Sequence, residues 1–397
     1  MKEPSSQHPQ VAEWLAHVRT LSVEIGPRGS TRLGERQGAE YARSAFEKMG
    51  LQPVWETFQS ARSIFHPHLL GSILFLVAFI LFPLGGRLTA LLAAGLSVLA
   101  LVSELQELAF QTNLFRLLVP KGESQNVWAR IPPSGEHRRD LLLVGHVDTQ
   151  RTPLIFRSKR WVDAYDRFTM IAFAAFIAQS LLFTLAVIFG WGWVWFACIP
   201  AAICAVLLAA ICIEAETTPF TNGANDNATA VGMVLSLAGQ LSKQPLEHTR
   251  VWAVITGCEE VQHYGMIDFY QRHRQEMKNP QALVFEMLGC AGPAWSVKEG
   301  IIVPFYSDPI LVALAEKVSA AHPDLMAYPT QISGGNSELA DGGRFKVPGI
   351  TLFGLTKTGA APFWHQRADT FDKLDPGVME RTWRFTQALL REIDQAG

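Results

Sequence analysis

The sequence predicts an α/β fold in which a mainly parallel or mixed sheet carries helices on both faces, with two transmembrane helical hairpins inserted into it. Short apolar runs of the kind found in buried strands alternate with helical segments, and this alternation favours a parallel sheet. Two long stretches without charged residues interrupt the pattern. With 397 residues, the chain is long enough for one large α/β domain or two ordinary ones.

The strands and helices of the polar part are recognised by their periodicity and their length. Continuous apolar runs of four to eight residues, such as DLLLVG, are typical of strands that are buried on both faces. The expected strands are 126–132, 140–145, 250–256, 281–289 and 348–355. The expected helices are 9–24, 36–50, a helix that follows the loop TNGANDN, and 376–395.

The two charge-free stretches predict the hairpins. No Asp, Glu, Lys or Arg occurs between Arg62 and Arg87, or between Arg167 and Glu214. A helix needs about 20 apolar residues to cross the hydrocarbon core of a bilayer. The first stretch together with the apolar run after Arg87 provides two such helices, and the second stretch provides two more. The tryptophans near 190–195 suit a membrane interface. Buried helices of a soluble core, or an apolar dimerisation surface, are the alternative interpretations.

Two hairpins return the chain to the side from which it started, so all polar segments are expected on one face of the membrane. The expected divisions are 1–62, 105–167 and 214–397 for the polar domain, and 63–104 and 168–213 for the hairpins. The first sixty residues contain no apolar segment of the signal-peptide type. Basic residues at the polar ends of the hairpins outnumber the single Arg87 at a hairpin tip: Arg62, Arg157, Lys159, Arg160 and Arg167. The positive-inside rule therefore predicts a multi-pass membrane protein with its polar domain in the cytoplasm.

Charge and cysteine usage exclude two classes of function. The 34 basic and 36 acidic residues nearly cancel, so the chain lacks the basic surface of a nucleic-acid-binding protein. The five cysteines have no regular spacing, and three of them lie in the second apolar stretch. They predict neither a disulfide framework nor a cysteine-ligated zinc site.

Acidic residues and histidines that follow the predicted strands are the candidate metal ligands. They are His146, Asp226, the pair Glu259 and Glu260, Glu286, and His365. Open α/β sheets bind ligands at the carboxyl ends of their strands, so these groups are expected to converge there. Carboxylates gathered in one cleft need cations to compensate their charge, and two divalent metals would do so.

Each candidate has an ordinary structural explanation when it is taken singly. A histidine after a strand is usually a loop residue, and Asp226 in GANDN is usually a helix-capping residue. Adjacent glutamates usually lie on a solvated helix start. The order and the context of all six together favour the metal-site interpretation.

The sequence contains a series of motifs whose order resembles that of the zinc aminopeptidase family M28, a branch of the co-catalytic metallopeptidases. The motifs are IGPRGSTRLGERQGAEYARSAFEKMG, GHVDT, GANDNATAVG, GCEEVQHYG, FEMLG, NSELADGGRFKVPGITL and WHQRADTFDKLD. The resemblance spans the polar chain from about Trp14 to Asp375 and is interrupted only by the hairpins. It implies a membrane-embedded exopeptidase with a peptidase domain in three segments.

The resemblance also implies a role for each residue. Asp226 would bridge two zinc ions, although other divalent metals are possible. His146 and Glu286 would complete one site, and Glu260 and His365 the other. Glu259 would be the general base that takes a proton from the water held by both metals.

Supporting roles follow from the same resemblance. Asp148 would hydrogen-bond the ring of His146 and fix its tautomer, and Asp369 would do the same for His365. The Asp226–Asn227 peptide bond would be cis.

The sequence departs from the family pattern at three places. Glu286 stands where the family commonly has Asp, which leaves the metal at that site open. Ser337-Glu338 replaces the usual Ser-Asp in a segment expected to line the pocket, so substrate specificity is open. His263 has no ligand counterpart and is expected to be an ordinary loop or helix residue, and Cys258 and Cys290 are expected to be small buried residues.

Two other functions remain as alternatives. Trp364-His365 resembles a pair in glutaminyl cyclases, which share the fold and catalyse an acyl transfer. A non-catalytic metal-binding membrane scaffold is the other. The expected partners are a peptide or an N-acyl amino acid as substrate, the lipid bilayer, and a second copy of the chain bound through the hairpins. No nucleic acid is expected.

Overall fold

The computed structural model describes residues 4–111, 113–300, 303–332 and 335–396, and these residues form two compact units. The first unit comprises Met1–Ser60, Gly122–Arg151 and Phe220–Gly397. The second comprises Ala61–Lys121 and Thr152–Pro219, and it contains both predicted hairpin ranges.

A single mixed sheet organises the first unit, and its nine strands run in the order β1-β2-β4-β3-β5-β9-β6-β7, with β8 paired to β6. The strands are β1 Val54–Ala61, β2 Lys121–Ile131, β3 Arg139–His146, β4 Thr249–Thr256, β5 Gln281–Glu286, β6 Ala294–Glu299, β7 Phe305–Tyr306, β8 Tyr328–Gln331 and β9 Gly349–Phe353. The central strands β4, β3, β5 and β9 are parallel to one another, whereas β2 and β6 pair antiparallel at the two flanks. The predicted α/β fold with a mixed sheet is confirmed.

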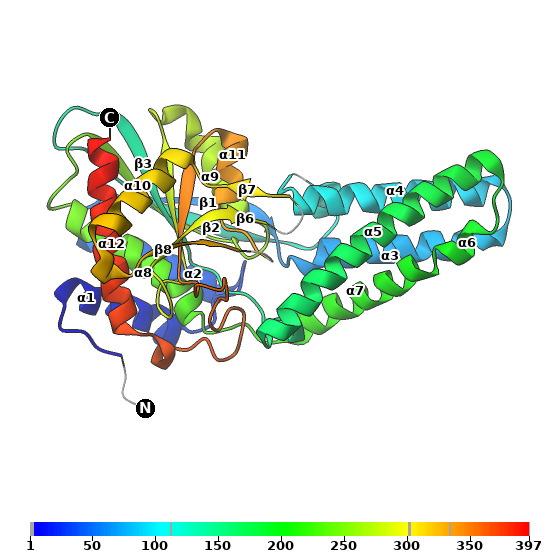
Figure 1. The fold of residues 1–397 in the computed structure, drawn as a ribbon, viewed down its shortest axis with the longest axis horizontal. Helices are drawn as coiled ribbons and strands as arrows, with labels where there is room; N and C mark the ends of the chain where they lie inside the picture. Colours follow the sequence, from blue (N-terminus) through cyan, green and yellow to red (C-terminus); the bar gives the residue numbers. More distant parts are fainter. Residues whose placement is uncertain (1–3, 112, 301–302, 333–334, 397) are drawn as a thin grey trace. The chain divides into compact units, whose positions relative to one another are not determined.

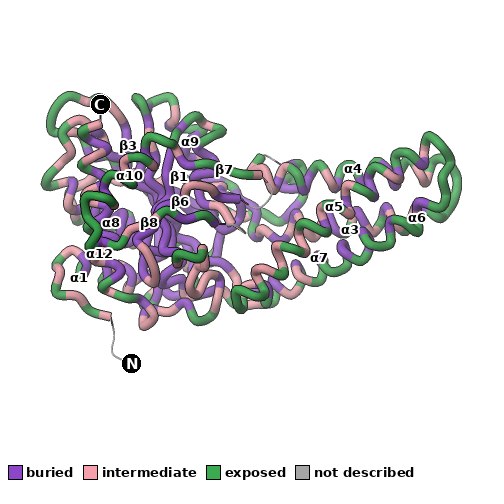
Figure 2. Tube along the Cα trace, in the orientation of Figure 1, coloured by how far each residue is buried: buried purple, intermediate pink, exposed green. Residues whose placement is uncertain are grey.

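Helices cover both faces of this sheet (Figure 1). On one face, α1 Pro9–Arg19, α2 Leu33–Lys48, α8 Thr229–Leu241 and α12 Pro376–Gln395 pack on strand residues such as Leu141 and Leu143. On the other face, α9 Tyr264–His273 packs on the alternate residues, among them Leu142 and Val144. This two-residue alternation is what a strand buried on both faces requires. The central strands β3, β4, β5 and β9 are accordingly buried along almost their whole length (Figure 2).

Several elements escaped the sequence-based prediction because their patterns are short or irregular. They are β1, β6, β7, β8, α9, α10 Pro309–Ala321 and α11 Leu339–Phe345. β7 has only two residues and β8 has four, so neither contains a readable alternation. The short elements η1 Thr20–Ile25, η5 Ala224–Ala228, η6 Arg274–Glu276, η7 Pro323–Leu325 and η8 Phe371–Lys373 lie between the longer ones.

The second unit is a bundle of the helices predicted as membrane spans. It consists of α3 Phe65–Leu81, η2 Phe82–Leu84, α4 Arg87–Leu108, η3 Leu114–Leu117, η4 Leu154–Phe156, α5 Lys159–Phe189, α6 Val194–Ala197 and α7 Ile199–Thr217. Four of its helices are long and apolar enough to cross a membrane, and at most 33% of each apolar window is buried in the bundle. Exposed segments therefore recur along these helices, as Figure 2 shows. The remaining apolar surface requires a lipid or protein environment.

Turns and helix starts in this bundle follow from local sequence. Gly85 and Gly86, both with positive φ, form the turn between α3 and α4, as the Gly-Gly-Arg motif predicts. α5 starts at Lys159, nine residues before the predicted hairpin boundary at 168. Its first turns are charged and carry the Lys159–Asp163 ion pair at 2.7 Å, so hydropathy alone did not reveal them.

Contacts between the two hairpins combine stacked aromatic rings with buried hydrogen bonds. The rings of Phe75 and Phe176 stack with centroids 4.1 Å apart. The side-chain amide of Gln179 in α5 donates to the Phe75 carbonyl of α3 at 3.0 Å and to the Ser97 hydroxyl of α4 at 3.1 Å. Ser180 donates to the Ser97 carbonyl at 3.1 Å. Polar side chains that satisfy one another in this way hold apolar helices together where the hydrophobic effect cannot.

Gly145 is a position where the fold tolerates no side chain. It lies in β3 directly before His146, where a Cβ atom would stand 2.9 Å from Cβ and 3.0 Å from the carbonyl carbon of Ala230 in α8. The absence of a side chain thus lets α8 approach the end of β3.

We expect Gly145→Ala to separate β3 from α8 and to destabilise the first unit by about 1–3 kcal/mol. Thermal unfolding of the solubilised protein measures this change as a lower Tm. Gly239→Ala, in α8, is the matched control. The added Cβ at Gly239 would meet only ordinary contacts of 3.5 Å or more. Equal effects of both substitutions would contradict the packing argument.

Candidate metal centre

Neighbouring parallel strands deliver three candidate residues to one edge of the sheet. His146 is the last residue of β3 and Glu286 the last of β5, while Glu259 lies in the turn after β4. β3 pairs with both β4 and β5 in parallel, so the three chain segments end side by side.

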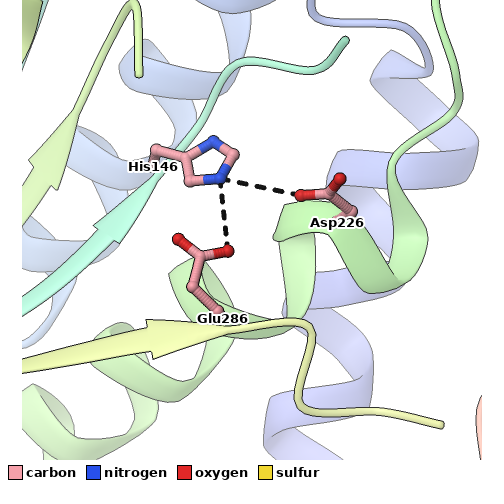
Figure 3. A group of neighbouring side chains, drawn as sticks. All are labelled: His146, Asp226 and Glu286. Atoms are coloured by element: carbon pink, nitrogen blue, oxygen red, sulfur yellow. Dashed lines mark ion pairs between the residues drawn. The ribbon is translucent and has the colours of Figure 1, made fainter. Parts of the chain in front are cut away.

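His146, Asp226 and Glu286 form the first group of possible ligands (Figure 3). The Nε2 atom of His146 lies 3.7 Å from Asp226 Oδ1 and 3.6 Å from Glu286 Oε2. All three side chains are buried. The imidazole and both carboxylates therefore point into a common space.

Asp226, Glu260 and His365 form a second group that shares Asp226 with the first. The Nε2 atom of His365 lies 3.3 Å from Asp226 Oδ2 and 3.1 Å from Glu260 Oε2. The two carboxylate oxygens of Asp226 thus face different histidines. The structure brings all five predicted ligands together.

Asp226 reaches this position from η5 and not from the end of a strand, contrary to the expectation from the sequence. Its backbone has φ −114° and ψ 90°, and the Asp226–Asn227 peptide bond is cis, as the family resemblance implied. Asn227 donates through its amide to Glu286 Oε2 at 3.0 Å. The Asp226 segment is thereby tied to the end of β5.

Asp369 supports this segment rather than serving only the ring of His365. Its carboxylate accepts the backbone N–H of Asn225 at 2.7 Å and that of Asp226 at 3.0 Å. A carboxylate that accepts two adjacent amides fixes the local backbone. Asp369 thus has a role at the Asp226 loop in addition to the one predicted beside His365.

Asp148 also acts mainly on the backbone. The Nδ1 atom of His146 lies 3.1 Å from the Asp148 carbonyl and 3.5 Å from its carboxylate. The carboxylate accepts the backbone N–H of Glu259 at 3.0 Å and that of Glu260 at 3.1 Å, together with the hydroxyl of Ser30 at 2.6 Å. Asp148 therefore positions the adjacent glutamates as well as the histidine.

Arg28, which the sequence reasoning did not single out, holds the loops behind both groups. Its buried guanidinium donates to five carbonyl oxygens at 2.8 to 2.9 Å, those of Leu21, Gly26, Val147, Asn222 and Gly223. The chain segments after β3 and before Asp226 are thereby joined through one side chain. The motif IGPRGS contains Arg28, but three of its five acceptors, those of Val147, Asn222 and Gly223, are at least 119 residues away and left no local signal.

The protonation of the carboxylates reflects their crowding. Burial raises the pKa of Asp226 to about 8, and repulsion by Glu260 adds to this effect. Burial, followed by the charge of Glu259, raises the pKa of Glu260 well above its usual range. Burial raises the pKa of Glu286 in the same way. Burial lowers the pKa of His365 to about 4, which leaves its imidazole neutral and able to bind a metal.

The donor set fits zinc. Among the five predicted ligands, three buried carboxylate oxygens accept no hydrogen bond from the described residues: Asp226 Oδ2, Glu260 Oε1 and Glu286 Oε1. Buried polar atoms normally have partners, so these oxygens are available to a metal ion. The nitrogen–oxygen separations of 3.1 to 3.7 Å in the two groups are close to the roughly 3.3 Å between two ligands of a tetrahedral zinc ion.

Glu259 lies against both groups but also faces a histidine. Its Oε2 is 3.6 Å from His146 Nε2, and its Oε1 is 3.1 Å from His263 Nε2. Burial disfavours its charged form, but the nearby His146 and the hydrogen bond from His263 outweigh burial and lower the pKa of Glu259. The surroundings of Glu259 therefore favour its ionised form, whereas burial disfavours that form in Asp226, Glu260 and Glu286.

His263 corrects an expectation from the sequence. It is buried within the site and is not an ordinary loop residue, because its Nδ1 lies 2.9 Å from Asp341 Oδ2 while its Nε2 faces Glu259. Burial lowers its pKa, but the charges and hydrogen bonds of Asp341 and Glu259 raise it well above the usual value overall. The spacing of four residues from Glu259 was the available signal.

Glu338 adds a further carboxylate. One of its oxygens lies within 4.8 Å of oxygens of Glu259 and Glu286, and its Oε1 accepts the Thr256 hydroxyl at 2.6 Å. Burial, then repulsion by Glu259, raises the pKa of Glu338 to about 7. The segment that was expected to line the pocket thus places an acid beside the candidate base.

The two cysteines near the acids remain thiols. Burial raises the pKa of Cys258 well above its usual value and that of Cys290 to about 12. Thiols held in this form are neither nucleophiles nor metal ligands.

Comparison with known proteins finds a family match in part of the chain. Residues 214–390 match the model of peptidase family M28, so the family predicted from the motifs is confirmed for this part of the chain. The matched range includes five candidate residues, Asp226, Glu259, Glu260, Glu286 and His365, and His146 precedes it. No curated protein sequence matched.

Solved structures with the same fold include peptidases and cyclases. A leucine aminopeptidase precursor from Bacteroides thetaiotaomicron aligns with a TM-score of 0.58 at 11% identity, over 98% of each chain. A Zn-dependent exopeptidase from Parabacteroides distasonis aligns with a TM-score of 0.54 at 11% identity, over 99% of each chain. A glutaminyl cyclase from Bacteroides thetaiotaomicron, solved with N-acetylhistamine, gives 0.57 at 12% identity, over 98% of this chain and 99% of the other. At these identities the similarity establishes the fold.

We expect Arg28→Met to remove the guanidinium donor from five carbonyl oxygens. Those of Leu21 and Gly223 also accept a backbone N–H, so the carbonyls of Gly26, Val147 and Asn222 are the three that lose their donor among the described residues. Because each unsatisfied buried group costs about 1–3 kcal/mol, the free energy of unfolding should fall by at least about 3 kcal/mol. Denaturant unfolding of the solubilised chain measures this loss. The exposed Arg32, changed to Met in the same way, should have no comparable effect, and a similar loss in both variants would refute the role given to Arg28.

Proposed function

We propose that this chain, whose residues 214–390 belong to peptidase family M28, is a membrane-bound, zinc-dependent exopeptidase of the aminopeptidase type. Its substrates are peptides or N-acyl amino acids, whose peptide or amide bonds it hydrolyses. The observation that carries the proposal is the sharing of Asp226 between two ligand groups.

Two divalent ions account for that sharing. Asp226 Oδ1 faces His146 and Asp226 Oδ2 faces His365, which is the orientation that a bridging carboxylate needs. His146 and Glu286 would then complete one site, and Glu260 and His365 the other. Positive charge at both sites would compensate carboxylates whose pKa burial otherwise raises.

The protein side chains perform the proton transfers. A bound zinc ion supplies a Lewis acid and lowers the pKa of water towards neutrality. Glu259, buried and ionised, takes a proton from the attacking water and donates it to the leaving amine. Asp148 and Asp369 hold the backbone of Glu259, Glu260 and Asp226 in place during these steps.

The four apolar helices anchor the enzyme in the bilayer as a multi-pass protein. Four chain connections join the two units, so the peptidase unit stays tethered to the membrane. We place this unit on the cytoplasmic side. Several basic residues lie at the helix ends that connect to this unit along the chain, whereas only Arg87 lies at a hairpin tip, and the positive-inside rule assigns the more basic side to the cytoplasm. Hydrophobic peptides concentrated at the membrane are suitable substrates, and the exposed helix surfaces also offer a contact for a second copy.

Glutaminyl-cyclase-like acyl transfer is the second candidate, and two observations favour it. Glutaminyl cyclases are among the structures with this fold, and the rings of Trp364 and His365 lie 4.6 Å apart. The complete set of two ligand groups favours the peptidase, since it provides for two metals. A metal-binding scaffold without catalysis is the third candidate.

The test uses the full chain purified in detergent or nanodiscs. Metal analysis, hydrolysis of a library of aminoacyl, dipeptide and N-acyl substrates, and cyclisation of N-terminal glutamine are measured before and after chelation. We expect bound zinc and hydrolysis that is lost on chelation and restored by zinc. Cyclisation without hydrolysis would favour the cyclase, and zinc without either reaction would favour the scaffold.

We expect Glu259→Gln and Asp226→Asn to fail in different ways. Glu259→Gln removes the proton acceptor and should lower kcat by at least about 10²-fold while the zinc content stays unchanged. Asp226→Asn weakens the shared ligand and should lower the zinc content itself. The exposed Glu123→Gln serves as the control. Turnover by Glu259→Gln at the wild-type rate would show that Glu259 is not the base.

A further inference from the structure

Behind Glu259 lies a buried pair, His263 and Asp341, that the proposed reaction does not use. His263 lies directly before α9, and Asp341 comes from α11. His263 Nδ1 is 2.9 Å from Asp341 Oδ2, and His263 Nε2 is 3.1 Å from Glu259 Oε1. Glu259, His263 and Asp341 thus form one row of side chains that leads away from the ligand groups.

The two oxygens of Glu259 have different neighbours. Oε1 faces His263, whereas Oε2 lies 3.6 Å from His146 Nε2 at the first ligand group. The terminal torsion of a glutamate is broad, so an isolated carboxylate rotates readily. A ring nitrogen held against Oε1 restricts this rotation and keeps Oε2 directed at the ligands.

Asp341 in turn fixes the ring. With a carboxylate at each nitrogen, the imidazole can neither flip nor turn out of its plane without losing a buried contact. His263 and Asp341 are both at most 3% exposed, so water does not replace a lost partner. The orientation of Glu259 therefore depends on Asp341 through His263.

The backbone at His263 is consistent with a requirement for its side chain. His263 has φ 55° and the preceding Gln262 has φ 76°, a region that favours glycine and disfavours other residues. A histidine at such a position persists when its surroundings compensate the backbone cost. The two carboxylate contacts provide that compensation.

We propose that His263 and Asp341 are a positioning pair for Glu259, which hold one carboxylate oxygen so that the other faces the reacting water. Asp341 acts only through His263. This inference rests on the proposed function, in which Glu259 transfers the proton.

The kinetic test compares His263→Leu, Asp341→Asn, the double variant and His263→Gln. We expect His263→Leu to lower kcat by about 10–100-fold with unchanged KM and zinc content, as for other residues that orient a catalytic group. The kcat of the double variant should be no lower than that of His263→Leu, because in this proposal Asp341 affects Glu259 through His263. His263→Gln retains an N–H donor and should recover part of the rate.

His273 offers a matched control. It is a second histidine between two carboxylates, 2.9 Å from Glu56 and 2.9 Å from Glu276, and it lies outside the candidate centre. His273→Leu removes the same type of contact and should leave kcat unchanged. Additive losses in the double variant, loss of zinc, or an equal loss in His273→Leu would overturn the proposal.

A second readout does not depend on turnover. In ¹⁵N-histidine NMR spectra, His263 should show an exchange-protected Nδ1–H signal that Asp341→Ala abolishes and His273→Leu leaves in place. If the wild-type chain hydrolyses no substrate, the proposed function fails and this inference fails with it. If it hydrolyses substrate but lacks the protected signal, only the pairing is wrong.

Discussion

Compensation of buried negative charge is the constraint on which the candidate centre depends. Asp226, Glu259, Glu260 and Glu286 are at most 9% exposed and lie within one pocket. Carboxylates so placed are either protonated or paired with cations, because an isolated buried charge costs far more than folding can supply. Without a cation, burial raises the pKa of Asp226, Glu260 and Glu286. The divalent ions that we propose would compensate this charge, and they would also supply the chemistry of the proposed hydrolysis.

The fold maintains this arrangement through backbone contacts more than through contacts between the acids. Parallel β3, β4 and β5 end at one edge of the sheet, which places His146, Glu259 and Glu286 together. The loops between them are held by buried charged groups that bond to main-chain atoms: Arg28 to five carbonyls, and Asp148 and Asp369 to two amides each. These bonds fix the loops that carry Asp226, Glu259 and Glu260, so these residues are held in place although they lie outside the strands.

The residues at strand ends were predictable from the sequence, whereas those that act across the fold were not. His146 and Glu286 end apolar runs, and the charge-free stretches marked the four long helices. Asp226 was predicted as a residue that follows a strand, but it lies in η5, which no strand precedes directly. The contact of His263 with Asp341 spans 78 residues, and three of the five contacts of Arg28 span 119 to 195 residues. Such long-range partners leave no periodicity, and the same holds for two-residue strands such as β7.

Anomalous diffraction at the zinc absorption edge, from crystals of the full chain, tests the central claim most directly. The account predicts two peaks that share Asp226, one beside His146 and Glu286 and the other beside Glu260 and His365. A single peak that leaves one of these groups empty would contradict the two-metal centre. Peaks only at other places on the protein would contradict the assignment of the site itself.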